Sequence, residues 1–90
     1  MKDILIDGHR LLTTDEIADA VIAYARALTE TDDSDVVEFP TVYDGELSHC
    51  SLLLTGGTPV AVLEAAALTP ALPGADIALA EIERRVAARR

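Results

Sequence analysis

The sequence predicts a single α+β domain in which two helices pack on one face of a mostly antiparallel sheet. Ninety residues are enough for one hydrophobic core but not for two. Short apolar segments are joined by Asp-Gly and Gly-Gly pairs, which is typical of β-hairpins. Two longer segments repeat apolar residues at steps of three and four, which is typical of amphipathic helices. We therefore expect the element order ββαβββα within one domain, residues 1–90.

The chain is expected to begin with a β-hairpin. Apolar residues lie on both sides of Asp7 and Gly8, a pair that suits the positive φ angles of a two-residue type I′ turn. Strands are therefore predicted over residues 3–6 and 9–12. His9 is then expected to be a solvent-exposed residue beside the turn.

Residues 14–30 are predicted to form an amphipathic helix. Either Thr13 or Thr14 can cap it, and Thr13 with Glu16 has the spacing of a capping box. The segment 31–35 contains no apolar residue and lacks the glycine and distal glutamate of a calcium loop, so it is expected to be an acidic connection. The apolar stripe of the helix consists of Ile17, Val21, Tyr24 or Ala25, and Leu28.

Residues 36–64 are predicted to form a three-stranded antiparallel meander. Asp44–Gly45 and Gly56–Gly57 would each provide a two-residue turn. The central strand would then contain His49, and counting from the turns gives the register. This register pairs Tyr43 with Glu46, Phe39 with Cys50, Val37 with Leu52, Thr55 with Thr58, Leu52 with Ala61, and His49 with Glu64.

Two features of the meander leave room for other interpretations. Thr58 and Pro59 also suit the start of a helix, so residues 59–68 could be helical instead of forming the third strand. Pro40 has no backbone N–H, which favours an edge position for its strand.

A second helix is predicted over residues 75–89, after a break that contains Pro70, Pro73 and Gly74. Arginines in its last turns suit the negative end of the helix dipole, and binding to phosphate is the alternative interpretation. The predicted apolar stripe is Ala75, Leu79, Ile82 and Val86, and the arginines are Arg84, Arg85, Arg89 and Arg90.

Side chains alternate across a strand, so Cys50 and His49 point to opposite faces and cannot form a catalytic pair. Cys50 is expected to be a small, unreactive core residue, because the other residues of its face are apolar. This inward face consists of Val37, Phe39, Leu52, Leu54, Ala61 and Leu63. The face of His49, which also includes Ser51, is expected to be a partner-binding surface. Its candidate residues are Val36, Glu38, Val42, Leu47, His49, Leu53, Val60, Val62 and Glu64.

The leading functional prediction is a non-enzymatic interaction module. Two helices on the opposite face would leave the valines and leucines uncovered, and such apolar patches usually mark interaction sites. Only Phe39, Tyr24 and Tyr43 are aromatic, so the core is built from smaller side chains and self-association would bury further apolar area. The partner is expected to be a second copy of the chain or another protein. No catalytic, metal-binding or cofactor-binding residue is assigned.

An enzyme or metal-dependent domain centred on His49 is an alternative. In the predicted register, Glu38 and Glu64 lie beside the imidazole and Ser51 lies on the same face. A hydrolase would also need a nucleophile turn and an oxyanion loop, which a regular strand does not supply. A metal site would have three ligands with only one nitrogen among them.

The charge and the single cysteine restrict the partners and the compartment. Seven basic and 16 acidic residues give a formal net charge of −9, which disfavours nucleic acid and fits a basic protein better. One cysteine without zinc-type spacing fits a reducing cytoplasm. Neither a membrane-spanning stretch nor a signal peptide is recognisable, so we expect a cytoplasmic protein without a membrane partner.

The segment TGGTPVAVLEA, residues 55–65, resembles the G-x-P-V-A-V-L hairpin of Phd/YefM-type antitoxins. The resemblance implies a dimeric regulator that represses its own promoter and neutralises a toxin. It also implies DNA contacts, for which the chain offers its four C-terminal arginines, Arg84, Arg85, Arg89 and Arg90. The rest of the chain departs from the short strand and helix that precede the hairpin in that family.

Overall fold

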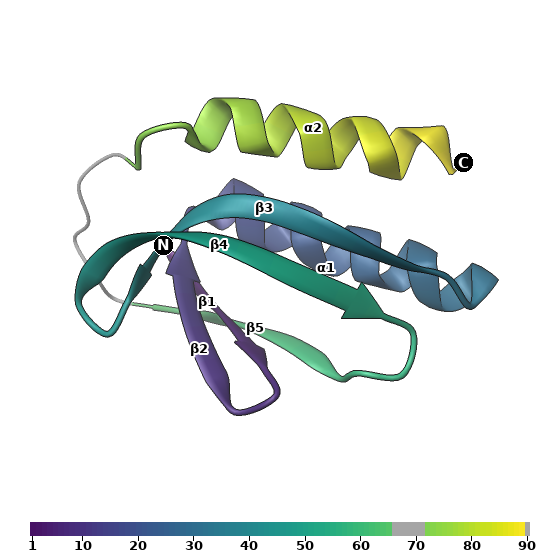
Figure 1. Cartoon of the computed structure of the whole chain (residues 1–90), viewed down its shortest axis with the longest axis horizontal. Coiled ribbons are helices and arrows are strands. Elements are labelled where there is room, and N and C mark those ends of the chain that lie inside the picture. Colours follow the sequence, from purple (N-terminus) through teal and green to yellow (C-terminus); the bar gives the residue numbers. More distant parts are fainter. Residues whose placement is uncertain (66–71, 90) are drawn as a thin grey trace.

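The computed structural model describes residues 1–65 and 72–89 of the chain. The predicted α+β class and element order are confirmed: within these residues, five strands form one open sheet with only antiparallel neighbours, and two helices accompany it. In Figure 1, α1 lies behind the strands and α2 runs beside β3. The elements are β1 (Lys2–Ile6), β2 (His9–Thr13), α1 (Asp15–Thr31), β3 (Ser34–Tyr43), β4 (Glu46–Thr55), β5 (Val60–Glu64) and α2 (Ala75–Ala88).

Two hairpins form as their turn residues predict. The φ angles are 48° and 81° at Asp7 and Gly8, and 53° and 81° at Asp44 and Gly45. Positive φ at both central positions defines a type I′ turn, whose twist matches the right-handed twist of the flanking strands. The predicted β3–β4 register, with Phe39 opposite Cys50, is therefore confirmed.

The predicted pairing of the third meander strand is wrong. β5 pairs with β1 along its whole length, so the strand order is β4-β3-β2-β1-β5 and β4 lies at an edge of the described sheet. Glu64 is opposite Lys2 and not opposite His49. Gly56 and Gly57 do not adopt positive φ, so they do not form the two-residue turn that the predicted hairpin required.

The short connection between the two edge strands indicates that the sheet is strongly curved. This connection consists of residues 56–59. Neighbouring strands lie about 4.8 Å apart, so the edges of a flat five-stranded sheet would be about 19 Å apart. A fully extended connection of this length reaches only about that far. The hydroxyl groups of Thr55 and Thr58 are 3.0 Å apart, so the connection is folded. The two edges therefore converge at this end of the sheet.

Two buried threonines join β2 to β3 where the backbone ladder consists of a single pair, Leu12 and Val42. The hydroxyl of Thr13 donates to the carbonyl of Pro40 at 2.9 Å, and the hydroxyl of Thr41 donates to the carbonyl of Leu12 at 2.7 Å. Because the ladder is so short here, a missing N–H at Pro40 is tolerated between two strands. The edge position predicted for its strand is wrong, since β3 lies between β4 and β2.

α1 supplies most of the helical surface of the core. The side chain of Thr14 caps it by accepting a hydrogen bond of 3.1 Å from the N–H of Ile17. The capping box predicted with Thr13 is absent, because Thr13 belongs to β2. The predicted stripe is buried: Ile17, Val21, Tyr24, Ala25 and Leu28.

α2 packs less deeply than α1. Within Ala75–Ala88 the buried residue is Ile82, and the rest of the predicted stripe is partly buried against the core. Gly74 precedes the helix with a φ of 80°. Two predictions fall outside the described residues: the break at Pro70, and residues 66–68 of the alternative helix. The first part of the segment for which the alternative helix was considered forms strand β5 instead, so the predicted strand is confirmed there. None of the helices in the described ranges is long and apolar enough to cross a membrane.

Candidate interaction surface

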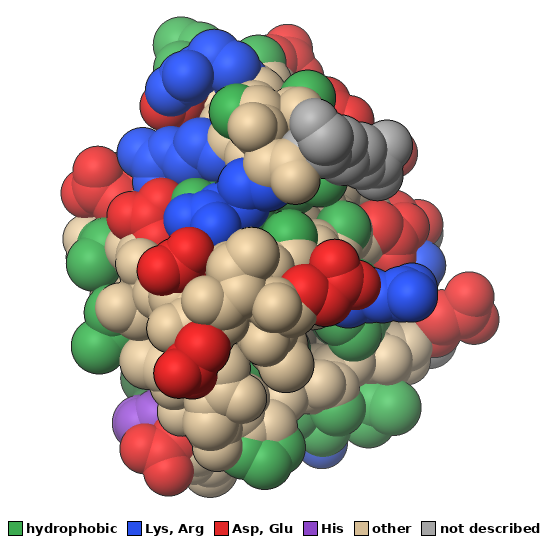
Figure 2. All heavy atoms as spheres, turned by 90° about the vertical axis from the view of Figure 1, so that its right-hand side faces the viewer, with side chains coloured by type: hydrophobic (Ala, Val, Ile, Leu, Met, Phe, Trp, Pro, Cys, Tyr) green, Lys and Arg blue, Asp and Glu red, His purple; other side chains and the backbone are tan. Residues whose placement is uncertain are grey.

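The sheet face turned away from α1 carries exposed apolar side chains. On β3 and β4, Phe39 and Leu54 are fully buried, whereas Val36, Leu47 and Leu53 are 47%, 59% and 56% exposed. The alternation predicted for these two strands is therefore confirmed. Figure 2 shows hydrophobic side chains gathered along the left flank of the molecule, away from the Lys and Arg side chains at the top.

Three predicted members of this surface do not belong to it. Val62 lies opposite the buried Ile4, and Val60 points the same way, so both pack against the core. Glu64 lies on the opposite edge strand, away from His49. The physical reason is the pairing of β5 with β1, which reverses the direction of every β5 side chain. Leu63, predicted to be inside, is accordingly 48% exposed.

The remaining predicted members, with Ser51, form a surface that we call the β3–β4 patch. Its two ends are apolar, because Val36 pairs with Leu53 and Val42 pairs with Leu47 across the two strands. Its centre is polar, so the continuous apolar surface expected from the sequence is not present. The patch consists of Val36, Glu38, Val42, Leu47, His49, Ser51 and Leu53.

Glu38 organises the polar centre of the patch. Its carboxylate accepts a hydrogen bond of 3.1 Å from the hydroxyl of Ser51 and lies 3.4 Å from Nε2 of His49. The contact with His49, followed by that with Ser51, holds the pKa of the Glu38 carboxyl below its usual value. The side chains of His49 and Glu38 are 67% and 63% exposed, so water reaches the whole cluster.

This geometry does not assemble the predicted alternatives centred on His49. Ser51 donates to Glu38, so the serine is not hydrogen-bonded to the imidazole as a nucleophile would be. The metal set is not brought together, because Glu38 and His49 lie on the neighbouring strands β3 and β4, whereas Glu64 lies on the opposite edge strand, β5. Within residues 1–65 and 72–89, no three His, Cys, Asp or Glu side chains are grouped to hold a metal ion.

Cys50 lies on the core side of β4, beside the polar centre but facing the other way. It is half-buried and packs against the core as predicted. Burial raises the pKa of the Cys50 thiol. The nucleophilic thiolate is therefore scarce at neutral pH, which agrees with a packing role.

A second polar cluster connects α2 to the start of β3. The carboxylate of Asp35 accepts hydrogen bonds from the hydroxyl of Tyr24 at 2.5 Å and from Arg85 at 3.2 Å. Arg89 binds Asp33 at 3.0 Å, and its guanidinium lies 5.6 Å from the centre of the Tyr24 ring. The hydrogen bond from Tyr24 is the main reason that the pKa of Asp35 is lowered. The sequence did not predict this cluster, and it shows that the connection 31–35 also anchors α2.

These contacts bear on the resemblance to antitoxins. Residues 55–65 do not form the hairpin that carries the resemblance, because β5 pairs with β1. Arg85 and Arg89 are bound to carboxylates of the chain, and Arg84 is bound to Glu81. Arg90 lies outside the described residues. The described arginines therefore have structural partners that a DNA phosphate would have to displace.

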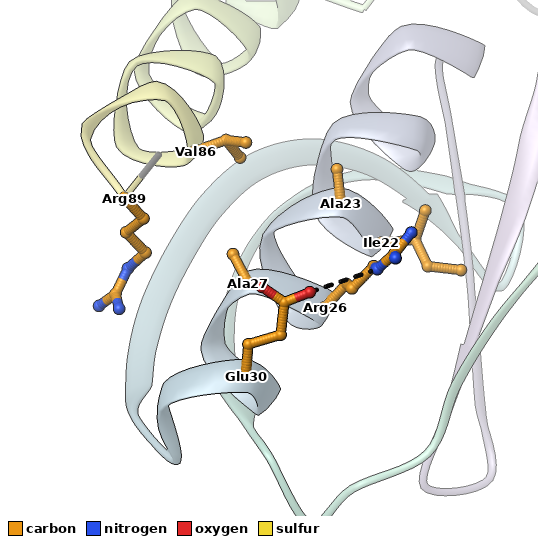
Figure 3. Close-up of a pocket in the computed structure, with 7 residues that line it drawn as sticks. All are labelled: Ile22, Ala23, Arg26, Ala27, Glu30, Val86 and Arg89. Carbon is orange, nitrogen blue, oxygen red and sulfur yellow. Dashed lines mark ion pairs between the residues drawn. The ribbon is translucent and has the colours of Figure 1, made fainter.

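An open groove of about 610 Å³ runs between α1 and α2. Figure 3 shows its floor of small apolar side chains, including Ala23 and Val86, and its charged rim. Arg26 pairs with Glu30 at 3.5 Å, and Arg89 pairs with Asp33 outside the groove. Because the rim charges are already paired, we assign no ligand to this groove.

No protein-family model matches the chain, and no curated protein or solved structure matches it at a significant level.

Proposed function

We propose that this chain is a non-enzymatic interaction module that forms a homodimer through the β3–β4 patch. The observation that supports this proposal is the exposure of Val36, Leu47 and Leu53 on the face of the sheet turned away from α1 (Figure 1). Contact between such side chains and water is unfavourable by roughly 25 cal/mol per Å² of apolar surface. Contact with a second copy would remove part of that surface from water.

The distribution of charge favours a second copy as the partner. Residues 47–63 contain no acidic or basic side chain apart from His49, although the whole chain has a net charge of −9. Two such chains repel each other at a distance, so they approach best where few carboxylates are presented. The carboxylate of the β3–β4 patch is that of Glu38, which accepts a hydrogen bond from Ser51 and contacts His49. A basic protein would bind more favourably at the acidic surfaces than at this uncharged segment. In the proposed setting, a reducing cytoplasm, Cys50 stays a thiol.

Light scattering coupled to size-exclusion chromatography tests the proposal on a dilution series of the full chain. Leu47→Glu and Leu53→Glu place a carboxylate at either end of the patch. Ile77→Glu is the matched control, because Ile77 is 79% exposed on α2, outside the patch. We expect a dimer mass for the wild type and for the control, and a monomer mass for both leucine variants.

Circular dichroism of each variant verifies that its fold is intact, since all three replaced side chains are exposed. A wild-type protein that stays monomeric at the highest concentration would contradict the proposal. Leucine variants that dimerise as well as the wild type would show that the β3–β4 patch is not the interface.

A further inference from the structure

The strand at the border of the β3–β4 patch presents an open backbone edge. β4 is the outer strand of the described sheet and is ten residues long. Residues 46–49 are exposed on both faces of the strand. Long edge strands usually carry a lysine, a proline or a bulge that prevents pairing with another chain. β4 has none of these: its pairing with β3 is continuous, and its acidic or basic side chains are Glu46 and His49.

The turn between β3 and β4 determines which backbone groups point to the open edge. A two-residue turn closes on a hydrogen-bonded pair, here Tyr43 and Glu46. Hydrogen-bonded and non-hydrogen-bonded pairs then alternate along an antiparallel ladder. The even-numbered residues of β4 therefore bond to β3, and the odd-numbered residues direct their N–H and C=O groups outward. Four of these outward residues also project their side chains onto the patch: Leu47, His49, Ser51 and Leu53.

The order of these four side chains is self-complementary. Two antiparallel β4 strands must match odd-numbered with odd-numbered residues, because hydrogen-bonded partners exchange their N–H and C=O groups. One such register places Leu47 opposite Leu53 of a second copy, and His49 opposite Ser51. Apolar ends then meet apolar ends and polar centres meet, as a two-fold axis requires. A shift by two residues would instead place Leu53 opposite His49 and lose this match.

We propose that two copies join their β4 strands edge to edge in this antiparallel register, forming one continuous sheet. Leu47 and Leu53 of each copy then contact Leu53 and Leu47 of the other across the new strand pair, which removes part of the apolar surface of the two adjoining β3–β4 patches from water. The inference rests on the proposed homodimer and specifies how it is built. At the two-fold axis, Cys50 lies opposite Cys50 of the second copy, at a pair without backbone hydrogen bonds. The Cα atoms of such a pair are about 4.5 Å apart, which is within the range that a disulfide spans.

Cysteine cross-linking measures the register. The wild type is compared with two variants that move the cysteine along the strand, Cys50→Ser combined with Ser48→Cys and Cys50→Ser combined with Ser51→Cys. In the proposed register, residues 48 and 51 face residues 52 and 49, so the moved thiols are too far from their twins to bond. We expect mild oxidation with copper–phenanthroline to cross-link the wild type at least tenfold faster than either variant on a non-reducing gel.

A proline variant distinguishes a dimer formed by pairing of strand edges from a dimer formed by packing of two sheet faces. Ser51→Pro removes an outward N–H without removing an apolar side chain of the patch, and proline is tolerated where the N–H faces solvent. Ser51→Ala is the matched control, since it removes the hydroxyl and keeps the N–H. We expect Ser51→Pro to be monomeric and Ser51→Ala to remain dimeric. At dilutions where the wild type is also monomeric, the melting temperature of Ser51→Pro should be close to that of the wild type.

The outcomes distinguish this inference from the proposed function. A dimer that cross-links faster through residue 51 than through Cys50 overturns the register. A dimer that persists in Ser51→Pro and cross-links at none of the three positions overturns edge pairing, while the homodimer itself stands. A wild-type protein that remains monomeric overturns both proposals.

Discussion

Replacing either Val62 or Leu63 by glutamine tests which face of β5 is buried. The two residues are adjacent and point to opposite sides of the sheet. Pairing with β1 places Val62 opposite the buried Ile4 and Leu63 opposite Asp3. The meander predicted from the sequence alone would exchange their environments. Comparing the stability of the two glutamine variants therefore tests the strand order directly.

The structure gives different magnitudes for the two substitutions. Val62→Gln loses about 1 kcal/mol of apolar burial and desolvates an amide against the core for about another 1–2 kcal/mol. Leu63 is already 48% exposed, and glutamine keeps its inner carbon atoms, so the loss is about 0.5 kcal/mol. In a domain of this size, 1 kcal/mol shifts the melting temperature by about 4–8 °C. We expect a decrease of about 8–24 °C for Val62→Gln and below about 5 °C for Leu63→Gln.

Thermal and urea unfolding, followed by circular dichroism, measure both effects. All samples need the same protein concentration, because dimerisation adds to the apparent stability. Equal losses in the two variants, or a larger loss for Leu63→Gln, would refute the pairing of β5 with β1.

Three further predictions follow from the polar clusters and the charge. Tyr24→Phe removes the hydroxyl that donates to Asp35 and should lower the free energy of unfolding by about 1–2 kcal/mol, measured in urea. Tyr43→Phe, whose hydroxyl contacts the exposed His9, should change it by less than about 0.5 kcal/mol, and equal effects would contradict this difference. The pKa of Asp35 is lowered from 3.8, chiefly by the hydrogen bond from Tyr24, so its stabilising effect is complete above that value and is lost as the pH falls through the lowered pKa. Asp35→Asn should therefore be less stable at neutral pH and should flatten the pH dependence of urea unfolding below about pH 4; unchanged acid dependence would contradict this role. Finally, sedimentation equilibrium should show tighter association as NaCl rises from about 0.02 to 0.5 M, because salt screens the repulsion between two chains of charge −9, whereas weaker association would indicate an interface held by ion pairs.

Local chemistry explains which parts of the fold could be predicted from the sequence. The Asp-Gly pairs require positive φ at two adjacent residues, and this conformation determines both hairpins and their registers. The spacing of apolar residues in α1 and the cap at Thr14 are likewise properties of one short segment. The part of the patch on β3 and β4 depends only on the Asp44–Gly45 hairpin, so its exposed side chains were predicted correctly.

The features that the sequence did not reveal depend on contacts between distant segments. Residues 60–63 are apolar at every position, so their alternation does not indicate a buried face. β5 could pair with the free edge of either β4 or β1, and no local pattern in the sequence determines which of the two strands it pairs with. Arg85 and Asp35 are also far apart in the sequence, and an arginine near a helix C-terminus is expected from the dipole alone. A useful signal for the edge strand was the lack of lysine and proline in residues 46–55.

Residue-specific amide hydrogen exchange at low and high protein concentration tests the pairing of β4 with β4 most directly. In the monomer, the amides of Leu47, His49, Ser51 and Leu53 should exchange rapidly, while those of the even-numbered residues between them are protected by β3. At concentrations where light scattering shows a dimer, we predict that the four odd-numbered amides become protected as well. A dimer in which these four amides still exchange as rapidly as in the monomer would contradict edge pairing.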